Sequence, residues 1–215
     1  MINNENFQTN LRSYLEKILA IIIVLLLWEI LADYFIGRKW ISSPIQVLDR
    51  TLLMVQDGSL FIHSWQTFQE AILGLFLGIL TGLPLGMLLG YFRRLSEAVD
   101  PIIMGLYSLP RVSLAPLFII WLGIGLAAKV VLCASIVLFV VMFNIREGIK
   151  TVDQDLIDAL RCMNASRLKM LRYVIIPSLV PWLVTSVRIS IGLSLIGAVV
   201  GEMMGSSKGL GWYVN

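Results

Sequence analysis

Two arginines lie inside long apolar stretches of this sequence. Arg111 stands between Pro110 and Pro116, and Arg188 stands midway through an apolar run near the end of the chain. Because each proline removes a backbone donor, the helix around Arg111 is predicted to kink or break. A guanidinium stays charged at physiological pH, so in apolar surroundings it must face protein or water. Groups of this kind can bind an oxyanion transiently, with serine hydroxyls as further donors. The serines nearest to the two arginines in the sequence are Ser113, Ser190 and Ser194.

The alternative interpretation is that the arginines are structural. Arg188 can form an ion pair with Glu202 or with Glu70, which lie near the ends of apolar stretches. Charged side chains at membrane depth are commonly paired with one another. The sequence leaves both interpretations open.

The elements that must position these arginines are membrane-spanning helices. Hydrophobic residues make up 58% of the 215 residues and charged residues only 14%, well below the charged fraction of about 25% in soluble domains. Because a helix rises 1.5 Å per residue, about 20 apolar residues cross a hydrocarbon core. Five blocks approach that length: 18–36, 68–91, 101–122, 126–145 and 178–200. The sequence therefore predicts an all-α polytopic membrane protein with five visible spans.

A polar segment, residues 37–66, separates the first two blocks. Ser43 can cap a helix, Pro44 suits its first position, and Gly58 can end it. Four apolar residues would share one face of this helix: Ile45, Leu48, Leu52 and Val55. The pattern favours an amphipathic helix on the membrane surface, with an irregular loop as the alternative.

The distribution of Lys and Arg predicts the orientation, because basic residues accumulate in cytoplasmic connections. If the N-terminus is inside, ten of them lie on the inner side: Arg12, Lys17, Arg93, Arg94, Arg146, Lys150, Arg161, Arg167, Lys169 and Arg172. Five lie on the outer side: Arg38, Lys39, Arg50, Lys129 and Lys208. This asymmetry favours an N-terminus inside and places the loop at residues 146–177 in the cytoplasm.

Other chemistries find little support. The apolar blocks contain serines but no histidine, and no HExxH or CxxC motif offers metal ligands. The single histidine, His63, lies in an outer connection without metal partners. The glycine-rich segment Gly201 to Lys208 does not match the phosphate-loop motif GxxxxGK[ST], so no nucleotide site is expected. The net charge of +3 is too small to suggest nucleic acid. The alternative functions are an intramembrane enzyme, or an ion-driven carrier or channel with paired carboxylates inside its spans.

The cytoplasmic loop has the pattern of a helix, a turn and a second helix. Asp153 favours a helix start, and Asn164 stands where a left-handed residue would close that helix. One face of the first helix would carry Leu156, Ala159, Leu160 and Met163. Ser166 can cap a second short helix through Tyr173, before Pro177 breaks it at the fifth span.

This loop resembles the cytoplasmic loop of the permease subunits of binding-protein-dependent ABC importers. The family pattern is Glu-Ala-Ala, three residues, Gly, nine residues, Ile, one residue and Leu-Pro. Residues 158–160 take the first triplet, Asn164 the glycine position, Val174 the isoleucine position, and residues 176–177 the end, without a gap. Asp replaces the Glu and Leu the second Ala, and Asn is the next most tolerant residue at the glycine position.

The resemblance extends over residues 42–44, 109–111, 115–117 and 209–211, and is strongest to the branch that imports nitrate, taurine and alkanesulfonates. It implies the ABC importer permease fold and a location in the cytoplasmic (inner) membrane of a prokaryote. In that family a sixth span follows, so we expect that the chain is truncated. The domain expected is a single permease domain over residues 1–215, with an N-terminal span and interfacial segment at 1–66 and a core at 67–215.

The resemblance also implies the partners. These are two ABC ATPase subunits, a second permease copy that forms a homodimer with this chain, and an extracytoplasmic solute-binding protein. The chain itself would be a transport subunit and no enzyme, with no cofactor of its own, because ATP and Mg would bind in the partner ATPase. The loop would be the coupling helix, through which ATPase closure moves the spans. The coupling role falls on Asp158, Ala159, Asn164, Ala165, Ser166, Arg167 and Pro177.

A glycine repeats every four residues along the second apolar block. The repeat consists of Gly74, Gly78, Gly82, Gly86 and Gly90. Such a stripe of small residues lets two helix backbones approach closely. The partner helix belongs either to the same chain or to a second copy.

Overall fold

The computed structural model describes residues 2–32 and 41–214, with side chains from residue 13 onward. The chain divides into two compact units, residues 1–60 and 61–215, where the sequence suggested a division at residue 66. Arg38, Lys39 and the end of the first apolar block, residues 33–36, lie outside the described residues.

The first unit contains α1 (Ile2–Ile30) and α2 (Pro44–Gln56). Ser43 caps α2 as predicted: its hydroxyl accepts a hydrogen bond from Gln46 N, and the Gln46 side chain accepts one from Ser43 N. Asp57 and Gly58 end the helix, with Gly58 at φ +74°. The Ser59 N–H donates to the Asp57 carboxylate, and hydrogen bonding with Ser59 lowers the Asp57 pKa. The segment is thus helical, and its place on the membrane surface stays a prediction.

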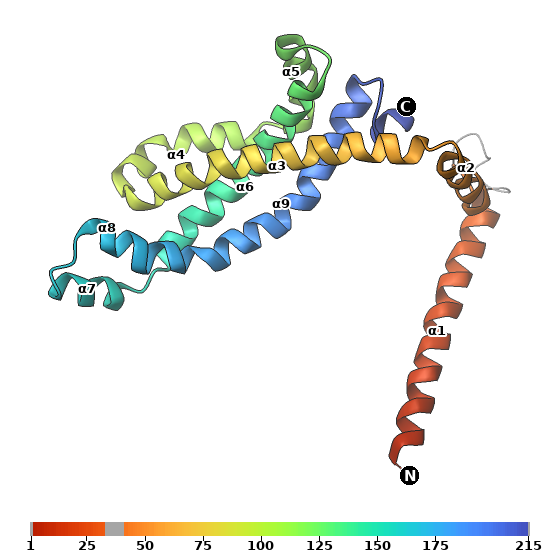
Figure 1. The fold of residues 1–215 in the computed structure, drawn as a ribbon, viewed down its shortest axis with the longest axis horizontal. Coiled ribbons are helices and arrows are strands. Elements are labelled where there is room, and N and C mark those ends of the chain that lie inside the picture. The colour runs from red at the N-terminus through yellow and green to blue at the C-terminus, as the bar shows by residue number, and fades with distance from the viewer. Residues whose placement is uncertain (1, 33–40, 215) are drawn as a thin grey trace. The chain divides into compact units, whose positions relative to one another are not determined.

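The second unit consists of long helices joined by short helical segments (Figure 1). Its elements are α3 (Ser59–Tyr91, which begins at the unit boundary), α4 (Arg93–Ser108), the 3₁₀ turn η2 (Arg111–Leu114), α5 (Ala115–Leu122), α6 (Leu126–Lys150), α7 (Gln154–Cys162), α8 (Arg167–Met170), the π turn η3 (Leu171–Ile175), α9 (Ile176–Met204) and α10 (Leu210–Tyr213). In Figure 1, α7 and α8 lie at one end of this unit and α10 at the opposite end.

Within the described residues, three helices are long and apolar enough to cross a membrane: α3, α6 and the continuous helix Arg167–Met204. The pair formed by α4 and the segment Arg111–Leu122 is a fourth span if the two parts are one, and it bends by 80°. The break falls at Leu109 and Pro110, where the sequence predicts it, because proline withholds a backbone donor. The first predicted span is not among these helices and stays a prediction.

The glycine stripe of α3 faces α6 of the same chain. A Cβ added to Gly82 would lie 2.6 Å from Leu138 O, and one added to Gly86 would lie 2.7 Å from Met142 O. The other three glycines face Cys133, Val137 and Ile149, which are also residues of α6. The stripe therefore serves packing within one chain, the first of the two alternatives.

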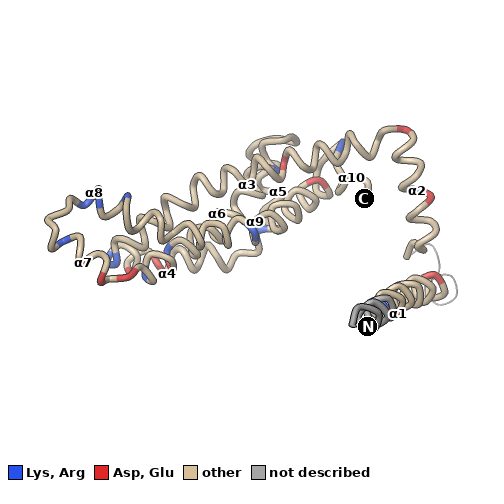
Figure 2. The backbone as a smooth tube through the Cα atoms, turned by 60° about the horizontal axis from the view of Figure 1, so that its bottom comes forward, with Lys and Arg blue, Asp and Glu red and all other residues tan. Residues whose placement is uncertain are grey.

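The largest cluster of buried apolar side chains lies between α6 and the first turns of the last long helix. It consists of Val137, Val141, Ile145, Ile175 and Leu179, with apolar residues of α3 packed against it. In Figure 2 most charged positions of this unit gather toward the α7–α8 end and the α10 end, with long uncharged stretches of α3 and α6 between them, whereas α9 carries Arg188 near its middle. This is the distribution expected of helices whose middle parts lie in lipid.

Candidate functional site

The first helix of the loop, α7, is closed at both ends by its own sequence. The Asp153 carboxylate accepts the N–H of Asp155 at 2.9 Å, which caps the start. Asn164 adopts φ +56°, the left-handed conformation expected at this position. Its N–H donates to Arg161 O and the next N–H, of Ala165, donates to Leu160 O, both at 2.9 Å. These bonds fix the turn that joins α7 to α8.

The second helix of the loop is not separate from the last span. Ser166 caps it by accepting Lys169 N, and α8, η3 and α9 then form one helix, Arg167–Met204. The prediction that Pro177 breaks this helix is wrong. Pro177 lies near the start of α9, directly after the π turn, where the hydrogen-bond register has already shifted. The hydroxyl of Ser178 donates to Val174 O at 2.7 Å, which gives that carbonyl group a side-chain partner.

The loop exposes apolar side chains on a polar segment. The exposed fraction is 52% for Leu156, 77% for Met163 and 75% for Leu168. Exposed apolar groups rimmed by polar residues mark sites of protein contact. The Asp158–Arg161 ion pair, at 2.8 Å, lies on the surface of α7 and contributes little stability there.

The structure brings six of the seven predicted coupling residues together. Two lie in α7, three form the turn, and one begins α8: Asp158 and Ala159, then Asn164, Ala165 and Ser166, then Arg167. The seventh, Pro177, lies further along the continuous helix, near the start of α9.

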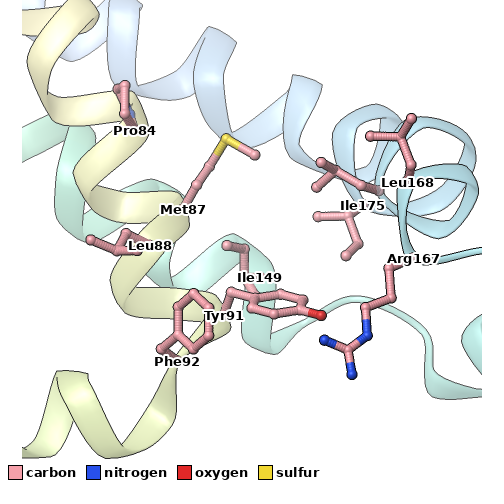
Figure 3. A pocket seen from close by; sticks show the side chains of 10 residues that line it. Pro84, Met87, Leu88, Tyr91, Phe92, Ile149, Arg167, Leu168 and Ile175 are labelled. Atoms are coloured by element: carbon pink, nitrogen blue, oxygen red, sulfur yellow. The ribbon is translucent and has the colours of Figure 1, made fainter.

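Beside this loop lies an apolar cavity of about 470 Å³ between the end of α3 and the α8–η3 segment. In Figure 3, Arg167 and Leu168 come from the α8 side, and Met87, Leu88 and Tyr91 come from α3. Among the described residues that line the cavity, Arg167 is the only charged one. The α8 segment is therefore separated from the end of α3 by a cavity.

Arg111 begins the η2 turn, next to the break in the bent helix pair. Its guanidinium carbon lies 4.7 Å from the ring centre of Tyr107 and 4.4 Å from that of Phe139, and Nη2 donates to Tyr107 O at 3.1 Å. Aromatic faces attract a cation without neutralising it. The side chain is thus held in place and keeps its charge. Ser113, two residues on, is exposed.

Arg188 and the serines near it in sequence lie on different faces of α9. Arg188 is exposed and forms no hydrogen bond or ion pair with any residue in the described ranges 2–32 and 41–214. Ser190 and Ser194 are buried, and the Ser194 hydroxyl donates to Ala71 O of α3 at 2.6 Å. The predicted group of Arg188, Ser190 and Ser194 therefore does not share one surface.

The acidic residues suggested as partners for Arg188 have other partners. Glu70 accepts Lys129 Nζ at 2.7 Å, and Glu202 accepts the Thr67 hydroxyl at 2.7 Å. Lys129, which was counted on the outer side, lies near the start of α6 and is buried. His63 lies in α3 and is also buried, so its assignment to a connection was wrong. The sequence signal for these contacts was weak, because Glu70 and Lys129 are 59 residues apart and Thr67 and Glu202 are 135 residues apart.

The comparisons with known proteins agree with this geometry. Residues 74–215 match the family described as "Binding-protein-dependent transport system inner membrane component". The chain is 31% identical over 205 residues to the formylaminopyrimidine transport permease protein ThiX of Halalkalibacterium halodurans, covering 94% of this chain and 81% of the relative. It is 30% identical over 192 residues to the taurine transport system permease protein TauC of Escherichia coli, covering 87% and 70%.

A third relative is the putative aliphatic sulfonates transport permease protein SsuC of Bacillus subtilis, 28% identical over 202 residues, covering 94% of this chain and 73% of the relative. Among solved structures, a chain of the MetNI methionine ABC transporter in an inward-facing conformation matches with a TM-score of 0.60 at 25% identity. That match covers 69% of this chain and 74% of the other. The chain therefore belongs to the family of binding-protein-dependent transport system inner membrane components, the multi-pass permease subunits of ABC importers, which are transport subunits rather than enzymes and work with ATPase and solute-binding partners.

Proposed function

We propose that this permease conducts a small oxyanion, such as a sulfonate, taurine or nitrate, through a pathway lined by Arg111, Ser113 and Arg188. The names of two relatives, which refer to taurine and aliphatic sulfonates, support this class. A third relative is named for a formylaminopyrimidine, so the relatives alone do not decide the substrate. The observation that carries the proposal is the unpaired charge of Arg188 in a membrane span.

The charged side chain of Arg188 requires a polar surface facing it. An arginine at the centre of a lipid-facing helix costs about 2.5 to 3.5 kcal/mol on insertion scales. Arg188 is exposed on α9 and pairs with neither Glu70 nor Glu202, which are engaged elsewhere. A water-filled pathway between this chain and a second, identical copy would supply that surface. Transient attraction of an anion there permits its release, which a carrier requires.

Arg111 fits the same role at a second position along the proposed pathway. Its charge is held by two aromatic rings rather than by a carboxylate, so it remains available to an anion. The adjacent helix break places irregular backbone beside it, which is tolerated at membrane depth next to protein or a water-filled cavity. Ser190 and Ser194 pack inside the helix bundle, and we therefore leave them out of the proposed lining.

We place the α7–α8 end in the cytoplasm, with the N-terminus on the same side. Basic residues concentrate at that end, as the positive-inside rule requires of a cytoplasmic face. They include Arg93, Arg94, Arg146, Lys150, Arg161, Arg167, Lys169 and Arg172. Two ATPase subunits, which bind ATP and Mg²⁺, would each dock on one α7–α8 loop of a homodimeric pair, and a solute-binding protein would deliver the anion at the opposite face.

The continuous helix from Arg167 to Met204 explains how the loop can drive transport. Because α8 has no hinge-like break before α9, a displacement of the loop by the ATPase passes directly into the helix that carries Arg188. Rigid elements that move as bodies are a common means of coupling distant sites. The same helix thus joins the proposed docking surface to the proposed pathway.

Uptake by reconstituted complexes tests the substrate class. With the ATPase and binding protein present, we expect taurine or an alkanesulfonate to stimulate ATP hydrolysis, and Arg188→Gln to lower uptake at least about tenfold, which corresponds to about 1.4 kcal/mol. Arg188→Lys, which keeps the charge, should retain part of the activity. Arg94→Gln is the matched control, since it removes the same charge from an exposed position outside the proposed pathway. Unchanged uptake of the stimulating anion by Arg188→Gln would remove Arg188 from the pathway.

A further inference from the structure

Three consecutive backbone N–H groups are bound by side chains at the end of the second unit opposite the coupling loop. Gly209 N donates to His63 Nδ1 at 2.9 Å, Leu210 N to Thr67 Oγ1 at 2.9 Å, and Gly211 N to Glu202 Oε2 at 2.7 Å. These groups stand at the start of α10, where helix geometry leaves N–H groups without helical partners. Two neighbouring helices thus supply all three acceptors.

The acceptors come from α3 and α9 and are buried. His63 and Thr67 lie four residues apart on one face of α3, and Glu202 lies near the end of α9. Their exposed fractions are 9%, 2% and 1%. The Thr67 hydroxyl also donates directly to Glu202 Oε1 at 2.7 Å. This bond joins α3 to α9 at the point where both hold the segment at residues 205–213.

The backbone of this segment approaches the Glu202 side chain so closely that glycine is required. Gly209 has φ +114°, and a Cβ there would overlap the Glu202 carboxylate. A Cβ on Gly211 would lie 2.9 Å from Glu202 Cβ and would overlap Val199 O. The two glycines therefore allow the backbone to present its N–H groups to the acceptors.

Further contacts hold both sides of the segment. Lys129 Nζ of α6 donates to Ser206 Oγ at 2.8 Å while it pairs with Glu70. The ring of Trp212 stacks on His63 with centres 5.5 Å apart, and Tyr213 meets His63 edge-on at 4.6 Å. The segment is thus bound to three helices by polar and aromatic contacts.

We infer that His63, Thr67 and Glu202 are positioning residues for transport, which clamp residues 205–213 across α3 and α9 and hold this end of the pathway closed. They line no pathway themselves and act through the segment. Opening of this end by separation of α3 from α9 must break the Thr67–Glu202 bond and release the segment. The link to opening rests on the proposed function, whereas the clamp itself does not.

Hydrogen exchange of residues 205–214, measured by mass spectrometry on the complete transporter complex without solute, tests the clamp. Thr67→Val removes one acceptor, so we expect exchange of this segment to accelerate about fivefold, the effect of losing one hydrogen bond. Thr67→Ser keeps the hydroxyl and should restore slow exchange. His63→Phe should accelerate exchange, and His63→Asn, whose amide oxygen takes the place of Nδ1, should accelerate it less.

Thr81→Val is the matched control. Thr81 lies on the same helix, and its hydroxyl donates only to carbonyl groups of α3, Leu77 O and Gly78 O. This variant should leave the exchange of residues 205–214 unchanged. Equal exchange in Thr67→Val and the wild type, or faster exchange in Thr67→Ser as well, would contradict the clamp.

A second measurement tests the positioning role separately. A non-hydrolysable ATP analogue with Mg²⁺ should close the ATPases and open the opposite end, so exchange of residues 205–214 in the wild type should rise at least about fivefold, as for loss of one clamp bond. In Thr67→Val the further rise should be smaller, since the clamp is already weakened. If the variants behave as expected but the analogue changes nothing, the clamp exists and its role in transport is refuted.

Discussion

The ammonium group of Lys129 in α6 donates to Glu70 Oε1 of α3 across 2.7 Å, with exposed side-chain fractions of only 5% and 0%. Glu70 also accepts Gln66 Nε2 at 2.8 Å, and Lys129 also donates to Ser206. A buried ion pair costs free energy to desolvate, and the mutual attraction and these additional bonds offset that cost. The pair therefore links α3 to α6 at a position of α3 that precedes the glycine stripe.

Removal of one partner of this pair leaves a buried charge without compensation. We expect Lys129→Met or Glu70→Met to lower the free energy of unfolding by about 3 to 5 kcal/mol, and the double variant to recover most of the loss. Thermal unfolding of the detergent-purified complex measures both effects. Glu97→Gln is the control, because its ion pair with Arg93 is of similar length, 2.8 Å, but exposed, and should change stability by less than about 1 kcal/mol. A single variant as mild as this control would show that the pair carries no buried charge.

The glycine stripe gives a prediction with an internal comparison. Gly82→Ala places a methyl group against the backbone of α6 and should lower stability by about 1 to 3 kcal/mol. Gly105→Ala adds the same group to α4, where nothing lies within 4 Å, and should stabilise its helix by about 0.5 to 1 kcal/mol. The unfolding temperatures of the two purified variants test this comparison, because they should shift in opposite directions. Equal shifts would contradict the close approach of α3 and α6.

The left-handed turn of the coupling loop predicts a ranking of substitutions at residue 164. Asn164→Gly should preserve or improve the turn, whereas Asn164→Val should cost about 1 to 3 kcal/mol locally, because a β-branched residue is strained at φ +56°. The measurement is the amount of ATPase that stays bound to the affinity-purified permease as the salt concentration is raised, which reports on the docking surface of the loop. Comparable retention with valine and glycine would mean that the turn does not shape the docking surface.

Local patterns predicted much of the fold. The four-residue glycine repeat indicated a close helix contact, the pair of prolines around Arg111 indicated the broken span, and Ser43 and Asn164 indicated helix ends that the structure contains. Each of these signals lies within a few residues of its effect, so the chain alone reveals it. Family membership then sets aside the alternatives of an intramembrane enzyme and a stand-alone carrier or channel.

The remaining features depend on contacts between distant segments. Glu70, Lys129 and Glu202 each lie near the end of an apolar block, where a charged residue is usual, and nothing local shows that they are buried together. Pro177 was a misleading signal because it directly follows the π turn at Leu171–Ile175, where the hydrogen-bond register has already shifted, so the helix continues through it. The serines near Arg188 were grouped by proximity in sequence, whereas the helical rotation separates their faces.

The central claim is that an ATPase drives this permease from the cytoplasm through the α7–α8 loop, and the native thiol of Cys162 tests it directly. Cys162 ends α7 and is exposed, whereas Cys133 is buried and donates to Ser194 O, so it serves as an internal control. A membrane-impermeant maleimide should label Cys162 in inside-out vesicles, fail to label it in right-side-out vesicles, and label it much more slowly once the ATPase is bound. Labelling from the outer face, or labelling that the ATPase does not slow, would contradict the account.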